Sequence, residues 1–252
     1  MSNTPVADGR ATSCAACPLR QKRALREFSA DELAIVQRMK TGELRMKPGA
    51  SFLRQGERNE HFYTILSGWA FRYKMLPDGR RQILNYALPA DLVGLQGSLM
   101  VEMEHSVEAL TDVTLCAFPR ERLWTLYSNS PSLAFDITWL AAREEQLVDE
   151  HLLTLGQRTA LERTAYVLLH LYTRAEEVGL TRGSDPVHLP ITQQHLADTL
   201  GLSLVHTNKT LKRLHVAGMI RWKDRLFEVL DRQALAAAAG GDITRIRQRP
   251  FI

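Results

Sequence analysis

Between about Leu44 and Phe118, short apolar stretches alternate with turns rich in glycine. The turns recur at a spacing of roughly eight to twelve residues, which is typical of a small antiparallel barrel or sandwich. Pro77-Asp78-Gly79 is a strong signal for one of its hairpins. Because no long helices alternate with these strands, the pattern excludes a domain built from βαβ units.

A short helix is predicted before this β region. Ser29 can cap it, and Glu32 completes a capping box. The apolar residues Leu33, Val36 and Met39 then face inward, so this helix is expected to pack on the β region.

After the β region the chain turns helical. A short helix with Pro119 near its start is followed by a long one from Ser132 to about Leu155, in which apolar residues recur at three- and four-residue steps. One apolar stripe suits packing on the barrel and a neighbouring stripe suits a partner helix, although a plain core helix explains the same pattern. The residues expected in a dimer interface are Ile137, Leu140, Ala141, Leu147, Val148, Leu152 and Leu155.

Residues 191–220 have the pattern of a helix-turn-helix, after a predicted helix over 157–178 and a predicted loop or linker over 180–190. Thr192 can cap the first helix, Gly201 supplies the left-handed residue of a tight turn, and Ser203 can cap the second helix. A generic helical hairpin rarely matches all these positions, so the pattern favours a motif that reads DNA.

The outward face of the second helix carries side chains suited to a duplex. Val205 can touch a thymine methyl group, Asn208 can pair with adenine and Lys209 can donate to guanine. We expect His206 to lie beside these base-contacting residues, and Ser203 to cap the helix that carries them.

Phosphate contacts are expected at the edge of this face and in a wing, which is predicted as two short strands around Lys223-Asp224. These contacts are expected from Lys212, Arg213, Arg221 and Lys223.

The charge distribution supports this assignment. The net charge is +4, but the stretch from His188 onward contains ten Lys and Arg and only five Asp and Glu. The positive excess therefore lies in the last quarter of the chain. A basic module on a near-neutral body suits a polyanion. No apolar run approaches the ~20 residues of a membrane span, and the first residues have no apolar signal segment; we therefore expect a cytoplasmic protein.

These features together resemble the Crp/Fnr family of bacterial regulators, over residues from about 14 to 235. PGASFLRQGE, FYTILSGWAFRY, PDGRRQIL and LPADLVGL resemble pieces of its cyclic-nucleotide-binding-type β-roll, and LGQRTALERTAYVLLHL resembles its hinge and first DNA-domain helix. The resemblance implies an α+β chain that forms a homodimer, binds double-stranded DNA at a palindromic operator and acts on RNA polymerase. The expected divisions are a cysteine-bearing leader (1–27), a β-roll sensor domain (28–130), a dimerisation helix (131–156), a winged helix-turn-helix domain (157–240) and a basic tail (241–252).

The resemblance argues against cyclic AMP as the ligand. Members that bind it carry a Gly-Glu pair and then an Arg-Ser/Thr pair in the phosphate cassette. Here Ala90-Asp91-Leu92-Val93-Gly94-Leu95 lacks the Glu, and His105-Ser106 lacks the Arg. Without the guanidinium, the main contact to the cyclic phosphate is missing.

The oxygen-sensing branch of the family, typified by the fumarate-nitrate-reduction regulator, is a closer match. That branch holds a [4Fe–4S] cluster on three N-terminal cysteines and one β-roll cysteine. Cys14 and Cys17 resemble the start of the N-terminal motif, and Cys116 in ALTDVTLCAFP resembles the distal ligand. The third N-terminal cysteine would fall near Arg23, so three thiolates remain.

Several alternatives stay open for these cysteines. A fourth cluster ligand is unassigned, with Asp8 and His61 as candidates. After the iron–sulfur cluster we consider a thiol switch, then zinc on three thiolates and one His. Another effector bound in the β-roll, with structural cysteines, is a further alternative.

The recognition helix also departs from the oxygen-sensing branch. That branch places Glu, Ser and Arg where this chain has Val205, Asn208 and Lys209. Val205 offers no acceptor for a cytosine amino group. We therefore expect a different operator.

Two other functions match parts of the pattern. A C-x-x-C oxidoreductase would need its motif at a helix N-terminus beside a βαβ sheet, and a cyclic-nucleotide-binding regulatory subunit would not need the helix-turn-helix. The sequence also has no nucleophile–base pair, phosphate loop or metal-hydrolase spacing. We therefore expect no enzymatic activity.

Overall fold

The computed structural model describes residues 12–22, 24–183, 185–241 and 249–252. It divides into two compact units, of which the first comprises Met1–Met75, Tyr86–Glu145 and Arg247–Ile252, and the second comprises Leu76–Asn85 and Gln146–Ile246. The units thus divide inside the long helix, whereas the sequence suggested borders at residues 130 and 156. The candidate ligand Asp8 and most of the predicted basic tail lie outside the described residues.

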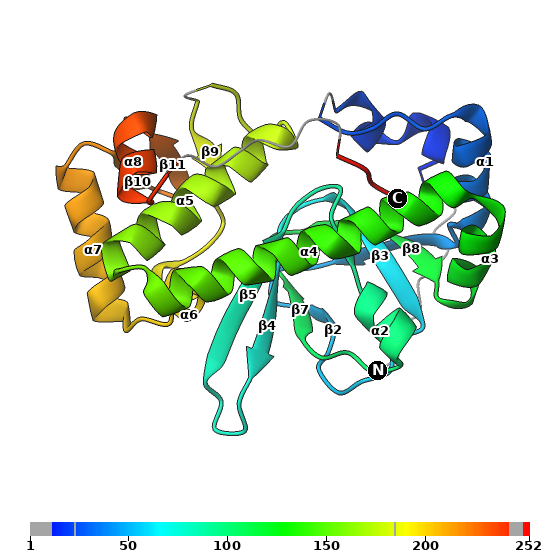
Figure 1. The fold of residues 1–252 in the computed structure, drawn as a ribbon, viewed down its shortest axis with the longest axis horizontal. Helices are drawn as coiled ribbons and strands as arrows, with labels where there is room; N and C mark the ends of the chain where they lie inside the picture. The colour runs from blue at the N-terminus through cyan, green and yellow to red at the C-terminus, as the bar shows by residue number, and fades with distance from the viewer. Residues whose placement is uncertain (1–11, 23, 184, 242–248) are drawn as a thin grey trace. The chain divides into compact units, whose positions relative to one another are not determined.

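The sensor region is built on two four-stranded sheets, with strand orders β1-β8-β3-β6 and β2-β7-β4-β5 (Figure 1). The predicted β region is therefore confirmed. Within β3, five consecutive residues from Phe62 to Leu66 are buried, as in a strand covered on both faces. The strands are β1 (Gly42–Met46), β2 (Ser51–Leu53), β3 (His61–Ser67), β4 (Ala70–Met75), β5 (Arg81–Ala87), β6 (Leu92–Val93), β7 (Ser106–Ala109) and β8 (Val113–Pro119).

The helices of this region frame the sheets. The capping box of α1 is present, since Ser29 Oγ accepts from the Glu32 amide and Glu32 accepts from the Ser29 amide. The short helix α2 was not predicted. The helical elements are η1 (Cys14–Ala16), η2 (Pro18–Gln21), α1 (Ala30–Met39), α2 (Leu95–Met100), α3 (Glu121–Asn129) and α4 (Pro131–Gln157).

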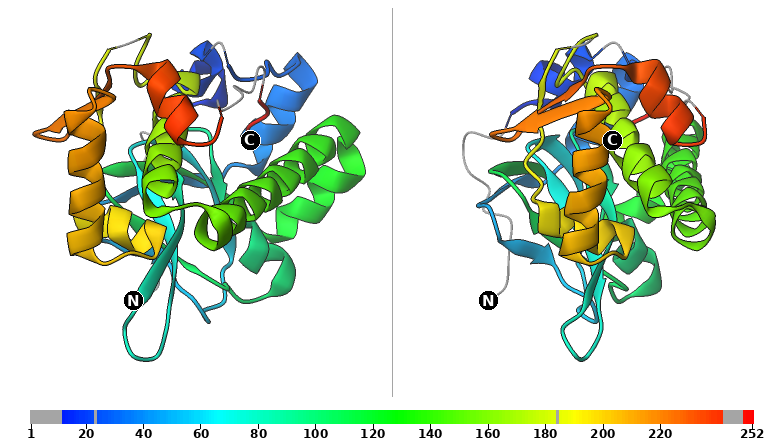
Figure 2. Two further views of the ribbon diagram at one scale, coloured as in Figure 1. Left: turned by 60° about the vertical axis from the view of Figure 1, so that its left-hand side comes forward. Right: turned by 90° about the vertical axis from the view of Figure 1, so that its left-hand side faces the viewer.

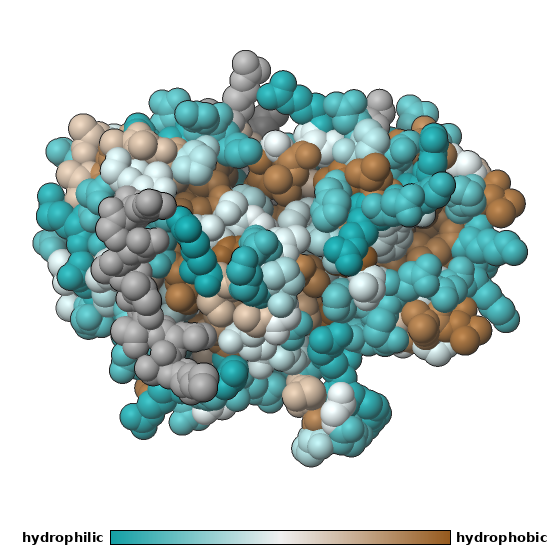
Figure 3. Space-filling model, turned by 180° about the vertical axis from the view of Figure 1, so that it is seen from behind, coloured by the Kyte–Doolittle hydropathy of each residue, from teal (hydrophilic) through white to brown (hydrophobic). Residues whose placement is uncertain are grey.

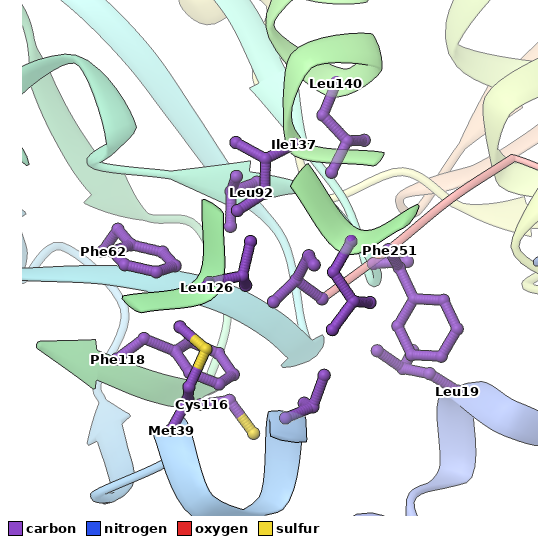
Figure 4. Packing of buried hydrophobic residues seen from close by; sticks show 14 of the residues in the cluster. Leu19, Met39, Phe62, Leu92, Cys116, Phe118, Leu126, Ile137, Leu140 and Phe251 are labelled. Atoms are coloured by element: carbon purple, nitrogen blue, oxygen red, sulfur yellow. The ribbon is translucent and has the colours of Figure 1, made fainter. Parts of the chain in front are cut away.

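A hydrophobic cluster joins these helices to the sheet β1-β8-β3-β6. Val36 of α1, Leu126 of α3 and Ile137 of α4 pack with Phe62 and Phe118, whose rings stack at 5.4 Å between centroids (Figure 4). A second cluster fills the space between the two sheets. The first cluster matters for function, because it also contains two cysteines.

The second unit is a winged helix-turn-helix. Thr159 and Glu162 form a capping box that starts α5, and α6 and α7 form the helical pair. Residues 187–188, expected in a loop or linker, instead form the third strand of the wing sheet, whose order is β10-β11-β9. The elements are α5 (Ala160–Glu177), β9 (Val187–His188), α6 (Gln193–Leu200), α7 (Leu204–Val216), β10 (Ile220–Lys223), β11 (Leu226–Val229) and α8 (Arg232–Ala238).

Among the described residues, no helix combines the length and apolar character required to cross a membrane. Seen from behind, the surface is largely hydrophilic, and apolar residues form separate patches on it (Figure 3).

Candidate nucleic-acid interface and thiol site

Local sequence determines the turn between α6 and α7. Thr192 Oγ1 accepts from the His195 amide at 3.1 Å and starts α6. Gly201 ends that helix at φ +63°, a conformation that costs other residues energy. Ser203 Oγ then accepts from the His206 amide at 3.2 Å and starts α7. The predicted caps and turn are therefore confirmed.

The buried and exposed faces of α7 are clearly separated. Leu211 and Leu214 face inward. Six of the predicted DNA-facing residues are exposed along the opposite side of α7 and at its cap, namely Ser203, Val205, His206, Lys209, Lys212 and Arg213. This face joins one apolar side chain to three cations, which suits the major groove.

Asn208 lies at the edge of this face. It is half-buried and lines a groove of about 510 Å³ between α7 and the wing, together with Thr192, Lys212, Lys223 and Arg225. Its Oδ1 atom is buried without a hydrogen-bond partner among the described residues. An unsatisfied amide oxygen beside three cations is suited to accept from a base edge or an ordered water.

The wing is a two-residue hairpin. Asp224 and Arg225 adopt φ of +51° and +64°, as a type I′ turn requires. Lys223 pairs with Leu226 at the base of this turn, and Arg221 pairs with Glu228 across the strands at 3.2 Å. The predicted phosphate contacts Arg221 and Lys223 are both exposed there. The Glu228 carboxylate thus orients the Arg221 side chain, whereas Lys223 does not take part in this ion pair.

The predicted interface residues fall on different sides of α4. Ile137 and Leu140 are buried in the cluster of Figure 4, where they pack on the sensor core. By contrast, Val148 is 50% exposed and Leu152 is 70% exposed. Of the other predicted residues, Ala141 is exposed, whereas Leu147 and Leu155 are half-buried.

The three cysteines come together in the sensor unit. Cys14 begins η1, which contacts α1, and its amide donates to Gln37 Oε1 at 2.6 Å. Cys116 lies on β8 opposite Glu43 of β1. Cys14 and Cys116 are buried, Cys17 is half-buried, and all three are free thiols.

Lys40 is a charged residue at the centre of this thiol site, and no motif in the sequence pointed to it. Its Nζ donates to Glu43 Oε1 at 2.8 Å and to the Thr12 carbonyl at 2.6 Å, and it also hydrogen-bonds the Cys116 side chain. Burial raises the pKa of Cys116 to about 12, although Lys40 acts in the opposite direction. Burial likewise raises the pKa of Cys14. Both thiols therefore stay protonated near neutral pH.

The candidate imidazole ligand is not part of the site. His61 lies opposite Pro119 at the start of β3, and burial lowers its pKa. Within residues 12–22, 24–183, 185–241 and 249–252, no three Cys, His, Asp or Glu side chains are grouped so that they could hold a metal ion.

His105, at the position where cyclic-AMP-binding members carry an arginine, is buried in the β-roll. Desolvation, with Arg72 and Lys74 nearby, lowers its pKa to about 3. The imidazole is therefore neutral at pH 7, and a neutral ring cannot pair with a cyclic phosphate as a guanidinium does.

Two known domain families match the chain. Residues 43–130 match the cyclic nucleotide-binding domain, and residues 162–238 match the Crp-like helix-turn-helix domain. These ranges contain the β-roll and the winged helix-turn-helix described above.

Curated relatives match over nearly the whole chain. The nitrogen fixation regulation protein FixK of Bradyrhizobium diazoefficiens is 32% identical over 228 residues, which is 89% of this chain and 94% of that protein. The transcriptional activator protein FnrL of Cereibacter sphaeroides is 27% identical, over 91% of this chain and 92% of its own.

Solved structures show the same fold. The structure of FixK2 from Bradyrhizobium japonicum has a TM-score of 0.71 and 27% sequence identity, and the match covers 80% of this chain and 97% of that chain. These relatives are named as regulators rather than enzymes. The chain accordingly belongs to the Crp/Fnr family of DNA-binding transcription regulators.

Proposed function

We propose that this regulator responds to redox state through the thiols of Cys14, Cys17 and Cys116. The observation that carries the proposal is that a leader motif and a distant β-roll cysteine are gathered around Lys40. Cysteines placed only for packing do not require a buried cation, whereas Lys40 opposes the rise in pKa that burial gives to Cys14 and Cys116.

Oxidation of the leader pair is the chemistry that this geometry favours. Cys17, the more exposed thiol, reacts first with an oxidant such as hydrogen peroxide, and the resulting sulfenic acid condenses with Cys14. In sum the two thiols give two electrons and two protons to the peroxide, whose O–O bond breaks as the S–S bond forms; one water leaves with formation of the sulfenic acid and a second leaves with its condensation. Cys116 supplies a third, slower thiol beside the same lysine.

An iron–sulfur cluster fits this arrangement less well. Thiolates are suitable cluster ligands, but the chain has only three cysteines. Glu43, a carboxylate at this site, accepts from Lys40 Nζ and from the Thr12 amide, each at 2.8 Å, so a fourth ligand is unassigned. Zinc on three thiolates and one His meets the same obstacle. We therefore favour thiol oxidation over either metal, a reversal of the order that the sequence alone suggested.

The redox proposal predicts a selective response to oxidant. Wild-type protein treated with peroxide should form a Cys14–Cys17 disulfide, detected by peptide mass spectrometry, and its affinity for operator DNA should change severalfold. Cys17→Ser should abolish both effects, while Cys116→Ser serves as the matched control and keeps the disulfide.

Two results decide against this proposal. Stoichiometric iron and sulfide in protein purified without oxygen, with a visible absorbance band that depends on the cysteines, would assign a cluster instead. If all three Cys→Ser variants bind DNA as wild type does, with and without oxidant, redox sensing is wrong.

We further propose that the regulator is a homodimer joined through α4, acting in the cytoplasm on a palindromic operator and on RNA polymerase. Support comes from the exposed apolar side chains of Val148 and Leu152 and from the family membership. A symmetric dimer presents two recognition helices ~34 Å apart on one face of the duplex. Cyclic AMP is not proposed as the signal, because His105 stands where the phosphate contact is needed.

Leu152→Glu should shift the mass in solution toward the monomer and weaken operator binding at least tenfold, because a charge replaces apolar contact area on both copies. Met100→Glu, at a side chain that is 68% exposed outside α4, is the control and should leave both properties unchanged. Light scattering checks the mass. An unchanged dimer for Leu152→Glu would place the interface elsewhere.

A further inference from the structure

The segment Arg249–Ile252 returns to the sensor unit and lies against the cysteine-bearing leader. The Arg249 amide donates to the Ala24 carbonyl at 2.7 Å, and the Arg26 amide donates to the Arg249 carbonyl at 2.9 Å. These bonds form a parallel bridge between Leu25 and Arg249. Figure 2 shows the C-terminal end beside the N-terminal elements in both views. The end of the predicted basic tail, residues 249–252, is thus a docked peptide.

The Arg249 side chain fills a polar socket. Its Nη2 donates to the Ala90 carbonyl at 2.9 Å and forms an ion pair with Asp91, and these two charged side chains are only 9% and 7% exposed. Asp91 is itself held in place, because its Oδ2 accepts from the Leu88 amide at 2.7 Å. Ala90 adopts φ +75°, an unfavourable conformation for a residue with a side chain. This backbone directs both acceptors at one guanidinium.

The next residues fill an apolar socket. The Phe251 ring stacks on Phe28 at 4.7 Å between centroids, and Thr64 Oγ1 donates to the Ile252 carbonyl. Phe251 and Ile252 are 3% and 4% exposed. Polar, ionic and apolar contacts therefore hold Arg249, Phe251 and Ile252 in place, with Pro250 buried between them.

The docked segment and the thiols share one core. Cys14, Cys116 and Phe251 belong to the same cluster of buried residues, in which Leu19 of the leader packs beside Phe251 (Figure 4). Leu25, which bridges to the segment, belongs to it as well. Moving the leader therefore disturbs both the thiols and the contacts that hold the segment.

We propose that the sensor unit contains a peptide-binding site for an Arg-Pro-aromatic-aliphatic segment, and that residues 249–252 of the same chain are its ligand. The docked segment holds the leader against the sensor core, so that Cys14 of the leader and Cys116 of β8 stay buried. Disulfide formation between Cys14 and Cys17 distorts the leader and releases the segment. This second step rests on the proposed redox function, whereas the protection of the thiols does not.

Linkage makes the two events reciprocal. If oxidation weakens docking by some factor, loss of docking favours oxidation by the same factor. Residues 249–252 follow the DNA-binding unit along the chain, so their release frees the part of the chain that comes after that unit. The segment is thereby a route from the thiols to the DNA-binding unit.

Thiol labelling of the full chain tests the first step. Phe251→Asp should raise the rate at which a maleimide labels Cys14 and Cys116 at least tenfold, measured by peptide mass spectrometry under reducing pre-treatment. Leu99→Asp makes the same change at a side chain that is 61% exposed and should leave both rates unchanged. Wild-type rates in Phe251→Asp would overturn the proposal.

Hydrogen exchange on the unmodified protein provides a test that needs no variant. The amides of Arg249 and Arg26 should be protected in reduced protein and should exchange at least tenfold faster after peroxide, while amides of β8 stay protected. Lack of protection in reduced protein refutes docking. Protection that survives a confirmed Cys14–Cys17 disulfide refutes release while leaving redox sensing intact. Protection that disappears on dilution would assign the ligand to a second copy and overturn the intramolecular arrangement.

Discussion

Asp91→Ala should lower the free energy of unfolding by about 3–5 kcal/mol, because it leaves one member of a buried ion pair without its partner. Arg249 then either remains buried as an uncompensated charge or leaves its socket together with Phe251. The Leu88 amide also loses its acceptor. Either outcome should lower the free energy of unfolding far more than the loss of a surface ion pair does.

Urea denaturation of the reduced protein measures this effect. The matched control is Asp112→Ala, which breaks the pair with Lys47 at 2.9 Å between side chains that are 74% and 86% exposed. That change should cost less than about 1 kcal/mol. Asp91→Asn should fall between the two, because it retains an acceptor for the Leu88 amide. A cost for Asp91→Ala no larger than for Asp112→Ala would show that the pair does not hold Arg249.

Lys209→Ala should weaken binding to the cognate operator by about 1–3 kcal/mol, or roughly fivefold to more than a hundredfold, and should blur the preference for one base pair in each half-site. We expect this effect because Lys209 lies on the exposed face of α7, one helical turn after Val205. It is not among the residues that line the groove between α7 and the wing. The affinity of the Lys209→Ala protein for unrelated DNA should change much less than its affinity for the operator. Fluorescence anisotropy with cognate and single-substituted operators measures both quantities.

Lys223→Ala is the contrasting variant. Lys223 lies beside the tip of the wing. We expect its side chain to contact phosphates there, so Lys223→Ala should weaken binding to all sequences alike and flatten the salt dependence. If Lys209→Ala instead lowers specific and non-specific affinity equally, Lys209 contacts phosphate and the assigned reading face is wrong.

The elements with strong local signals were predictable from sequence. Ser29, Thr192 and Ser203 all form the caps that their positions indicated, and Gly201 adopts the left-handed turn. Strand β9 was not predictable, since two residues between prolines have no periodicity. Their strand conformation is stabilised by pairing with β11, a contact formed only in the folded unit.

The thiol site was predictable only in part. The cysteines were visible as a motif and a family position, but Lys40 belongs to no motif, and its role depends on the way α1 delivers it to Glu43. The docked segment had no sequence signal at all. Arg249 read as one more cation of a basic tail, because its partner Asp91 lies 158 positions away.

The wing turn has a consequence for how this regulator can change over generations. Asp224 and Arg225 occupy left-handed positions that asparagine and glycine fill with less strain. Replacing Arg225 by glycine would relax the hairpin but would remove a cation from the tip of the wing, which we expect to lie against the DNA backbone. Selection for stability and selection for affinity therefore act on residue 225 in opposite directions.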